Sequence, residues 1–230
     1  MKYKKIVEGR FLNRPNRFIA KVLVGGVEET VHVKNTGRCK ELLVEGAFVY
    51  LYESDNPNRK TKYDLIAVEK VTPNGTMLIN MDSQVPNDVV AEWLKKGELF
   101  SQTATIKREV TYNKSRFDFY VEDGDCKAFI EVKGVTLENG GVASFPDAPT
   151  QRGVKHINEL ISAVENGYKA YVVFVIQMKG VHKFTPNDVT HKEFGDTLRK
   201  AQQSGVEIIA VDCIVKNDEI YIDEPVAVHV

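Results

Sequence analysis

Charged residues interrupt an apolar strand pattern in the middle of the chain, and this stretch limits the possible folds more than any other. Residues 127–135 (KAFIEVKGV) combine β-branched and aromatic side chains without proline, which predicts a β-strand. Glu131 and Lys133 lie two residues apart in it, so their side chains share one face. Burial of this pair is unfavourable unless a partner, a metal ion or a substrate replaces the lost hydration. The alternative is that this face of the strand is exposed to solvent.

A second strand pattern precedes the first and carries another carboxylate. Residues 116–121 (RFDFYV) place Asp118 between two phenylalanines, and the polar turn at residues 122–125 (EDGD) predicts an antiparallel hairpin. Asp118 then lies across from Glu131, and two adjacent carboxylates repel each other unless a cation lies between them. The hairpin therefore predicts a metal site for Mg²⁺ or Mn²⁺ with Asp118 and Glu131 as ligands.

The segment after Thr150 predicts a helix beside this hairpin. Apolar residues at helical spacing indicate a face directed to the core: Val154, Ile157, Leu160, Ile161 and Val164. Polar residues three and four positions apart fall on the opposite side: Arg152, Lys155, His156 and Glu159. Such a face is ordinarily exposed to solvent, but next to a metal site its basic residues can contact phosphate groups. Arg152 and Lys155 are our candidates for these contacts.

The chain up to about Asn80 reads as short strands separated by turns. Strand patterns cover residues 6–12, 17–24, 29–33, 47–53 and 63–71, with glycine and asparagine in the turns between them. Five short strands of this kind predict a small OB-type barrel, whose surface often binds nucleic acid. An SH3-like barrel is the alternative fold.

Charge is distributed unevenly along the chain, although the net charge is only -1. Residues 1–62 hold thirteen Lys and Arg against seven Asp and Glu, and the remainder holds 18 against 25. A basic barrel on an acidic remainder favours a polyanion such as DNA, or RNA, as the partner; chance asymmetry of a solvated surface is the alternative. Candidate contacts on the barrel are Arg14, Arg17, His32, Asn35, Thr36, Arg38, Arg59 and Lys60.

The loop at residues 35–37 has two interpretations. The sequence Asn-Thr-Gly fits a tight turn in which the glycine adopts a positive φ. The same residues, flanked by His32 and Arg38, also form a dense set of hydrogen-bonding groups that suits a phosphate or a base. The sequence leaves both interpretations open.

A boundary between two domains is predicted near residue 82, because residues 72–83 resemble a hinge, which gives domains at 1–82 and 83–230. The second domain contains helix patterns at about 86–99 and 187–204, and strand patterns at 169–177 and 206–215. Together with the hairpin, these elements predict an α/β sheet flanked by helices. Gln177 ends a buried strand, which makes it a candidate for contact with the metal or the scissile phosphate.

Further carboxylates could complete the metal site, and the sequence does not select among them: Glu92, Glu98, Glu109 and Asp147. Asp147 also suits the cap of the helix after Thr150. The three cysteines are far apart and lack a CxxC spacing, which argues against a disulfide framework and a thiolate zinc site. With no signal-peptide or membrane-span pattern, we expect a soluble cytoplasmic protein that does not bind membranes.

Eight motifs distributed over nearly the whole chain carry a family resemblance. They are NRF (16–18), HVKNTGR (32–38), RKT (59–61), INMDSQVPN (79–87), SRFDF (115–119), IEVKGVTL (130–137), FPDAPTQRGVKHINEL (145–160) and GVEIIA (205–210). In this order and spacing they resemble the sugar fermentation stimulation protein family. The resemblance implies an α/β protein (α+β overall) in which an N-terminal OB-like β-barrel precedes a PD-(D/E)xK nuclease-like mixed sheet flanked by helices.

The resemblance also implies roles for particular residues. Asp118, Glu131 and Lys133 match the nuclease core, and the adjoining helix contributes Thr150, Arg152, His156 and Glu159. The family is described as DNA-binding and is linked to maltose metabolism, which implies a DNA-binding protein that regulates sugar metabolism genes. The alternative function is a Mg²⁺- or Mn²⁺-dependent endonuclease acting on DNA or RNA. In that mechanism Lys133 orients the attacking water, and Gln177 or His156 steadies the phosphate.

Overall fold

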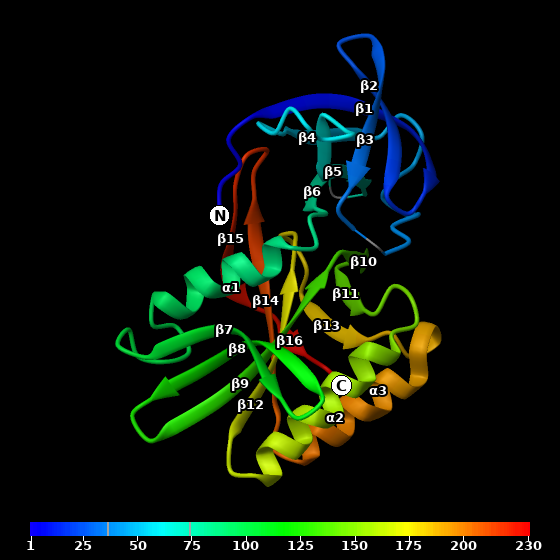
Figure 1. The fold of residues 1–230 in the computed structure, drawn as a ribbon. Helices are drawn as coiled ribbons and strands as arrows, with labels where there is room; N and C mark the ends of the chain where they lie inside the picture. Colours follow the sequence, from blue (N-terminus) through cyan, green and yellow to red (C-terminus); the bar gives the residue numbers. More distant parts are fainter. Residues whose placement is uncertain (36, 74) are drawn as a thin grey trace.

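A computed structural model describes residues 1–35, 37–73 and 75–230. Figure 1 shows a barrel formed by the N-terminal third of the chain, drawn in blue to teal, which packs on a larger part made of helices and sheets. The predicted fold class is confirmed in this outline. Within the described residues, no helix is both long and apolar enough to cross a membrane.

The barrel is a sheet of short strands that closes into a ring. Its strands are β1 (Ile6–Asn16), β2 (Ile19–Val24), β3 (Val27–Val33), β4 (Phe48–Glu53), β5 (Tyr63–Thr72) and β6 (Gly75–Asn80). The strand order is β3-β2-β1-β4-β5-β6, and an additional parallel pairing of β3 with β5 joins five strands into a ring. The ring closes because alternate side chains of these strands are buried inside it, as the predicted strand patterns require: Ala20, Val22, Val31, Val33, Val49 and Leu51.

The predicted hinge at residues 72–83 is wrong in part. Residues 75–80 form β6, which pairs with β5 from Ala67 opposite Asn80 to Thr72 opposite Gly75. The chain leaves this strand at Asn80 and enters the next helix at Val85. The connection between the barrel and the rest of the chain is therefore shorter than the sequence pattern indicates. The domain limits at 1–82 and 83–230 stay a prediction.

A second six-stranded sheet forms the centre of the larger part. Its strands are β7 (Thr105–Tyr112), β8 (Ser115–Asp123), β9 (Cys126–Val135), β12 (Lys169–Ile176), β14 (Glu207–Val215) and β15 (Ile220–Pro225), in the order β15-β14-β12-β9-β8-β7. Strands β9, β12 and β14 are parallel to each other, and the outer pairs are antiparallel. The sheet is therefore mixed, as predicted.

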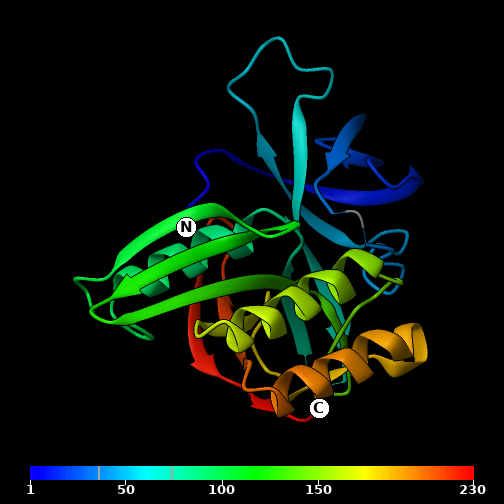
Figure 2. The ribbon, with the colours of Figure 1, turned by 60° about the horizontal axis from the view of Figure 1, so that its bottom comes forward.

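Helices cover both faces of this sheet. They are α1 (Val85–Lys95), α2 (Gln151–Glu165) and α3 (Asp188–Gln203), and Figure 2 shows α2 and α3 side by side. Along β12, Val172 and Phe174 pack in the core that contains α2 and α3, whereas Val173 and Val175 pack in the core that contains α1. A strand that is buried on both faces has a continuous apolar sequence rather than an alternating one, which explains the pattern at residues 169–177.

A smaller sheet was not predicted. It joins β10 (Leu137–Asn139), β11 (Val142–Phe145), β13 (Lys183–Pro186) and β16 (Ala227–Val228) in that order. These strands have two to four residues, and only β10 and β11 are close in sequence. Short strands with distant partners leave too little periodicity to be recognised.

The start of α2 corrects one sequence interpretation. Thr150 is the N-cap residue, and its hydroxyl accepts a hydrogen bond from the Gly153 N–H at 3.0 Å. Asp147 is not the cap of this helix. Its Oδ2 instead accepts a hydrogen bond from the Arg38 N–H at 2.9 Å, so Asp147 ties the segment before α2 to the barrel loop.

Candidate functional site

The hairpin of β8 and β9 opens at the position of Asp118. The two strands pair from Asp123 opposite Cys126 as far as Phe119 opposite Ile130. The next residue, Asp118, uses its side chain instead: its Oδ2 accepts a hydrogen bond from the Val132 N–H at 2.7 Å. The carboxylate takes the position of a backbone acceptor, and the strands separate around it.

Glu131 lies beside this opening and is almost completely buried, with 3% of its surface exposed. Its Oε1 contacts Lys133 Nζ and lies 2.5 Å from His156 Nδ1. Its Oε2 is also buried and has no hydrogen-bond partner among the residues that the structure describes. A buried carboxylate oxygen without a partner is costly, so this atom is available for a ligand.

His156 reaches Glu131 from α2, which corrects its predicted place on the polar helix face. The side chain is 6% exposed and packs near the ring of Phe117. Its Nε2 accepts a hydrogen bond from Arg152 Nε at 3.4 Å. Both contacts are satisfied when the imidazole carries its proton on Nδ1 and donates it to Glu131. His156 therefore holds Oε1 of Glu131 in place and leaves Oε2 free.

The two carboxylates have opposite pKa shifts. Burial raises the pKa of Asp118, and the nearby charge of Glu131 raises it further. Burial also acts to raise the pKa of Glu131, but the charge of Lys133 and the hydrogen bond with His156 outweigh it and leave the pKa lowered. The site thus favours the ionised form of Glu131, whereas for Asp118 the charge of Lys133 and the hydrogen bonds from Val132 and Asn87 do not outweigh burial and the charge of Glu131.

Most of the additional carboxylate candidates lie elsewhere. Glu92 pairs with the amino group of Met1, Glu109 pairs with Arg116, and Glu98 is exposed after the end of α1. Across residues 1–35, 37–73 and 75–230, no group of three or more His, Cys, Asp or Glu side chains is arranged to hold a metal ion. The candidate donor set is therefore the pair Asp118 and Glu131.

This pair fits Mg²⁺ or Mn²⁺ in its chemistry. Carboxylate oxygens are the ligands that hard divalent cations prefer, and Mg²⁺ commonly uses one or two carboxylates together with water and substrate phosphate oxygens. The unpartnered Oε2 of Glu131 supplies one donor in this set. A closed protein cage of three or more ligands is not required for such a site.

Asn87 is a site residue that the sequence analysis missed. It lies in the first turn of α1, and its Nδ2 donates a hydrogen bond to Asp118 Oδ1 at 2.8 Å. Both oxygens of Asp118 therefore have a donor, one from α1 and one from the Val132 N–H. The motif at residues 79–87 was a signal for this residue, but an asparagine in a helix has no pattern of its own.

Gln177 has a different position from the one predicted. Its Nε2 donates hydrogen bonds to Asn80 Oδ1 and to the Asp82 carbonyl, both at 3.0 Å, and the side chain is 1% exposed. These bonds join the end of β12 to the end of the barrel. A Cβ on Gly134 would lie 2.6 Å from Gln177 Oε1, so this amide oxygen lies beside the residue that follows Lys133.

Three of the predicted nucleic-acid contacts have partners inside the barrel. Arg14 donates hydrogen bonds to the carbonyls of Arg17, Asn35, Gly37 and Arg38, so it holds the loop at residues 35–38. His32 Nδ1 lies 3.0 Å from Asp64 Oδ1, and Arg59 Nη1 donates to Asp64 Oδ2 at 2.9 Å. The buried Asp64 and its neighbour Lys34 were not recognised from the sequence.

The remaining barrel candidates are more accessible. Arg17, Arg38 and Lys60 are exposed, and the Arg17 guanidinium lies 5.7 Å from the centre of the Phe18 ring, which is 51% exposed. Asn35 Oδ1 accepts a hydrogen bond from the Gly37 N–H at 2.8 Å, a contact typical of a tight turn. The positive φ predicted for Gly37 is wrong, because this glycine lies outside the left-handed region. Thr36 lies outside the described residues. Exposed arginine next to an exposed aromatic ring suits a single-stranded nucleic acid.

The basic residues of α2 lie on its outer surface. Arg152 and Lys155 are both exposed, and Lys155 Nζ donates to the Lys114 carbonyl at 2.5 Å. Because Arg152 also contacts His156, this face of α2 continues directly from the carboxylate site. The structure therefore brings together Asp118, Glu131, Lys133, His156 and Arg152. Gln177 lies beside Gly134, the neighbour of Lys133, but its amide nitrogen bonds to Asn80 and the Asp82 carbonyl rather than to this group.

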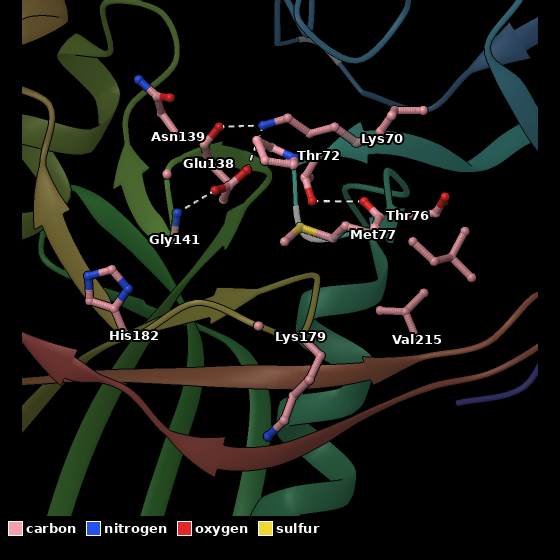
Figure 3. A pocket seen from close by; sticks show the side chains of 16 residues that line it. Lys70, Thr72, Thr76, Met77, Glu138, Asn139, Gly141, Lys179, His182 and Val215 are labelled. Atoms are coloured by element: carbon pink, nitrogen blue, oxygen red, sulfur yellow. Dashed lines mark hydrogen bonds and ion pairs between the residues drawn. The ribbon is translucent and has the colours of Figure 1, made fainter.

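A cavity of about 590 Å³ lies away from these residues (Figure 3). It opens between the β5–β6 hairpin and the β10–β11 hairpin, where Lys70 Nζ and Glu138 Oε2 pair at 2.6 Å. None of the predicted site residues lines it. The volume of this cavity therefore does not single out the candidate site.

Comparison with known proteins identifies both parts of the chain. Residues 12–79 match the model of the SfsA N-terminal OB domain, and residues 84–219 match that of the sugar fermentation stimulation protein RE domain. The first match decides for the OB barrel over the SH3-like alternative. It also agrees with the ring of five strands described above.

Individual relatives cover almost the whole chain. A sugar fermentation stimulation protein homolog from Clostridium beijerinckii is 59% identical over 228 residues, which is 99% of either chain. One from Desulfitobacterium hafniense is 62% identical over 220 residues, or 96% of this chain and 94% of the relative. The solved structure of Pyrococcus furiosus SfsA in complex with Ca²⁺ has a TM-score of 0.86 and 28% identity, and the match covers 100% of this chain and 98% of that one. The chain therefore belongs to the sugar fermentation stimulation protein (SfsA) family.

Proposed function

We propose that this protein binds DNA and hydrolyses its phosphodiester bonds at Asp118, Glu131 and Lys133 with the help of a divalent cation. The observation that carries the proposal is the buried pair of carboxylates in which Glu131 Oε2 lacks a partner among the described residues. A lysine two residues away on the same strand face adds the positive group that phosphoryl chemistry requires. Buried ionisable groups with shifted pKa values concentrate at functional sites.

Mg²⁺ or Mn²⁺ is the proposed cation. When bound between Asp118 and Glu131, it would polarise the phosphodiester and lower the pKa of an attacking water. The related Pyrococcus furiosus protein was solved in complex with Ca²⁺, another hard cation that prefers oxygen ligands. This relative supports a divalent-cation site in the family fold, and the donor set of this chain is consistent with it.

Other residues around the two carboxylates have separate roles in the proposed reaction. Lys133 Nζ orients the attacking water and stabilises the negative charge that develops on the phosphate. His156 keeps Glu131 Oε1 occupied and directs Oε2 to the cation, while Asn87 and the Val132 N–H fix Asp118. Water adds across the P–O bond, so the products are a phosphomonoester and a free hydroxyl group.

Nucleic acid reaches this site along the basic surface of the two parts. Arg38 is exposed on the barrel loop that contacts Asp147. Arg152, which follows Asp147 by a few residues, is exposed at the start of α2. Arg17 and Phe18 extend this surface on the barrel with a cation and an exposed ring. Phosphates bind the arginines and lysines, and unpaired bases stack on the aromatic ring.

The test is cleavage of end-labelled single-stranded DNA, duplex DNA and RNA with Mg²⁺ or Mn²⁺. We expect wild type to cleave at least one substrate, and Asp118→Asn and Glu131→Gln to lose at least about a hundredfold in rate. Glu122→Gln changes a half-buried carboxylate on the same strand as Asp118 and should leave the rate unchanged. Titration with Mn²⁺ gives a second readout, because both site variants should lose the bound ion. No cleavage of any substrate, or equal cleavage by Glu131→Gln, rules out hydrolysis at this site.

A second candidate function is DNA binding without cleavage, for example in the regulation of genes of sugar (maltose) metabolism. The exposed Arg17, Phe18, Arg38 and Lys60 on the barrel favour it, because they need no cation site. It predicts an affinity that falls steeply with salt and that is the same for wild type and Glu131→Gln. Sequence-specific binding by a protein that cleaves nothing would support this function over hydrolysis.

A further inference from the structure

A small cavity lies where the barrel loop meets the end of β9, and we call it the junction cavity. Its volume is about 160 Å³. Asn35 and Gly37 line it from the barrel, and Gly134 lines it from β9. Asp147 and Gln177 complete its polar wall. The cavity is therefore formed by both parts of the molecule.

The junction cavity is adjacent to the candidate catalytic group. Gly134 follows Lys133 directly, so the two residues are about 3.3 Å apart along the strand. On the opposite wall, Asp147 accepts a hydrogen bond from the Arg38 N–H, and the Arg38 side chain is exposed. Arg38 and Lys133 each follow or precede a residue that lines this cavity, Gly37 and Gly134, so a strand of nucleic acid that contacts both side chains runs close to it.

The size of the cavity suits one ring system. An engineered cavity of about 150 Å³ in another protein holds a single benzene molecule. A volume of 160 Å³ can thus accept one nucleobase but not two stacked bases. A base can enter only if it is unstacked and unpaired.

The charges of the lining exclude phosphate from the cavity. None of the described residues that line it is a lysine or an arginine, whereas Asp147 contributes a carboxylate. A phosphodiester would meet like charge there without a compensating cation. The uncharged part of a nucleotide does not have this penalty.

An unused acceptor faces the cavity. Gln177 Nε2 is held by Asn80 and the Asp82 carbonyl, and this fixes the position of Gln177 Oε1 beside Gly134. Within residues 1–35, 37–73 and 75–230, no group donates a hydrogen bond to this oxygen. Gln177 is 1% exposed and lines the cavity, so a donor from a ligand there can take the place of solvent at the amide oxygen.

We propose that the junction cavity receives the base of one unpaired nucleotide next to the phosphate bound at Glu131 and Lys133. Gln177 Oε1 and the Asp147 carboxylate accept hydrogen bonds from an amino or imino group of this base. The inference rests on the proposed function, and it specifies its substrate: a single strand, or a frayed end, with a free base at this position. Base pairing in an intact duplex would keep these donors occupied.

The experiment measures binding of labelled oligothymidylate to the full chain with Ca²⁺ in place of Mg²⁺ or Mn²⁺, and gel analysis after each measurement checks that the strand stays intact. A single abasic nucleotide is moved along the strand, and 3-methylthymine, which lacks the imino donor, is placed at the sensitive position. We expect one abasic position to weaken binding about fivefold or more, and 3-methylthymine to have a similar effect there. Other positions should change the affinity less.

Two leucine variants of the β10–β11 hairpin locate the effect. Ser144→Leu fills the junction cavity, whereas Asn139→Leu lies on the same hairpin and faces the 590 Å³ cavity of Figure 3. Ser144→Leu should bind the intact strand as weakly as wild type binds the strand that is abasic at the sensitive position. Removing that base should not weaken the binding of Ser144→Leu any further. Asn139→Leu should retain the wild-type pattern. Thermal unfolding checks that both variants fold.

The outcomes separate this inference from the function on which it rests. A wild-type protein that binds and cleaves the intact strand but shows no sensitive position overturns the base-binding cavity alone. Sensitivity to the abasic nucleotide without sensitivity to 3-methylthymine overturns recognition by Gln177 and Asp147. Absence of any binding or cleavage overturns both proposals. The wild-type scan gives this answer even if Ser144→Leu does not fold.

Discussion

His156 Nδ1 lies 2.5 Å from Glu131 Oε1, although one residue belongs to a helix and the other to the central sheet. The contact fixes which oxygen of Glu131 is engaged by the protein. It leaves Oε2 buried and without a partner among the described residues. We therefore propose that His156 is a positioning residue, which would act on a cation or a substrate through Glu131.

Replacing His156 should weaken cation binding more than it weakens folding. In His156→Ala the Glu131 carboxylate can rotate, so we expect the half-saturating Mn²⁺ concentration to rise about ten- to a hundredfold. His156→Asn places an amide donor nearer the backbone and should restore part of the affinity. The measurement is the cleavage rate as a function of Mn²⁺ concentration, together with direct Mn²⁺ titration.

The control for this prediction is His182→Ala. His182 is exposed and lines the 590 Å³ cavity instead of the carboxylate site. Its removal should leave the Mn²⁺ dependence unchanged. An unaltered Mn²⁺ dependence in His156→Ala would show that Glu131 needs no positioning by the imidazole.

Asp64 should make the stability of the barrel depend on pH. Burial acts to raise its pKa, but the hydrogen bond from Arg59, the charge of Lys34 and the hydrogen bond with His32 outweigh it and leave the pKa lowered. A carboxylate with a lowered pKa stabilises the folded state above its unfolded pKa of about 3.9, and this stability is lost as the pH falls through the folded pKa. Arg59→Ala should therefore lower the free energy of unfolding at pH 7, by about 2 kcal/mol.

Chemical denaturation at several pH values tests this expectation. The difference between wild type and Asp64→Asn should be largest near neutral pH and should shrink below about pH 4. Lys5→Ala removes a pair with Asp55 that is exposed on both sides, and it should change the stability little at any pH. A difference for Asp64→Asn that does not vary with pH would assign the effect to packing.

The contact between the barrel loop and Asp147 should depend on the absence of a side chain at Gly37. A Cβ at this position would overlap with Asp147 Oδ2 and lie 2.8 Å from Asn35 Oδ1. We expect Gly37→Ala to destabilise the protein by about 1–3 kcal/mol, because the loop must move away from Asp147. Asp147→Ala alone should cost about 1 kcal/mol through the lost hydrogen bond from the Arg38 N–H.

The double variant distinguishes this overlap from a general loop effect. With Asp147 shortened, the added methyl group of Gly37→Ala meets less resistance, so the combined loss should be smaller than the sum of the single losses. Equal or larger losses in the double variant would show that Gly37 is required for another reason. The measurement is the free energy of unfolding of all four proteins.

Local patterns in the sequence were sufficient for the elements that pair with near neighbours. The hairpin of β8 and β9 follows from two strand patterns and a short turn, and the barrel strands follow from alternating side chains. His156 was placed on the wrong face, because a polar residue on a helix is usually exposed. Its burial depends on Glu131, which is 25 residues away in the sequence.

The site residues that the sequence could not supply are those with distant, individual contacts. Asn87 meets Asp118 across 31 positions, and Gln177 meets Asn80 across 97. Amide side chains have no charge pattern or periodicity that would reveal such partners. The short strands of the small sheet could not be predicted for the same reason: β13 pairs with β11 and β16 rather than with a sequence neighbour.

Arg17 and Phe18 should contribute to DNA binding in different ways. Arg17→Ala removes an exposed cation, so the slope of log affinity against log salt should decrease by about one. Phe18→Ala removes an exposed ring that can stack on a base, so affinity should fall by about 1–3 kcal/mol with an unchanged slope. Binding of labelled single-stranded DNA at several salt concentrations measures both quantities.

Two further variants complete this experiment. Lys200→Ala removes an exposed cation from α3 and should leave both the affinity and the slope unchanged. Glu131→Gln should still bind DNA, because the barrel surface does not include the carboxylate site. If Arg17→Ala and Phe18→Ala bind like wild type while Arg152→Ala does not, the nucleic acid binds along α2 and the barrel loop makes no contact with it.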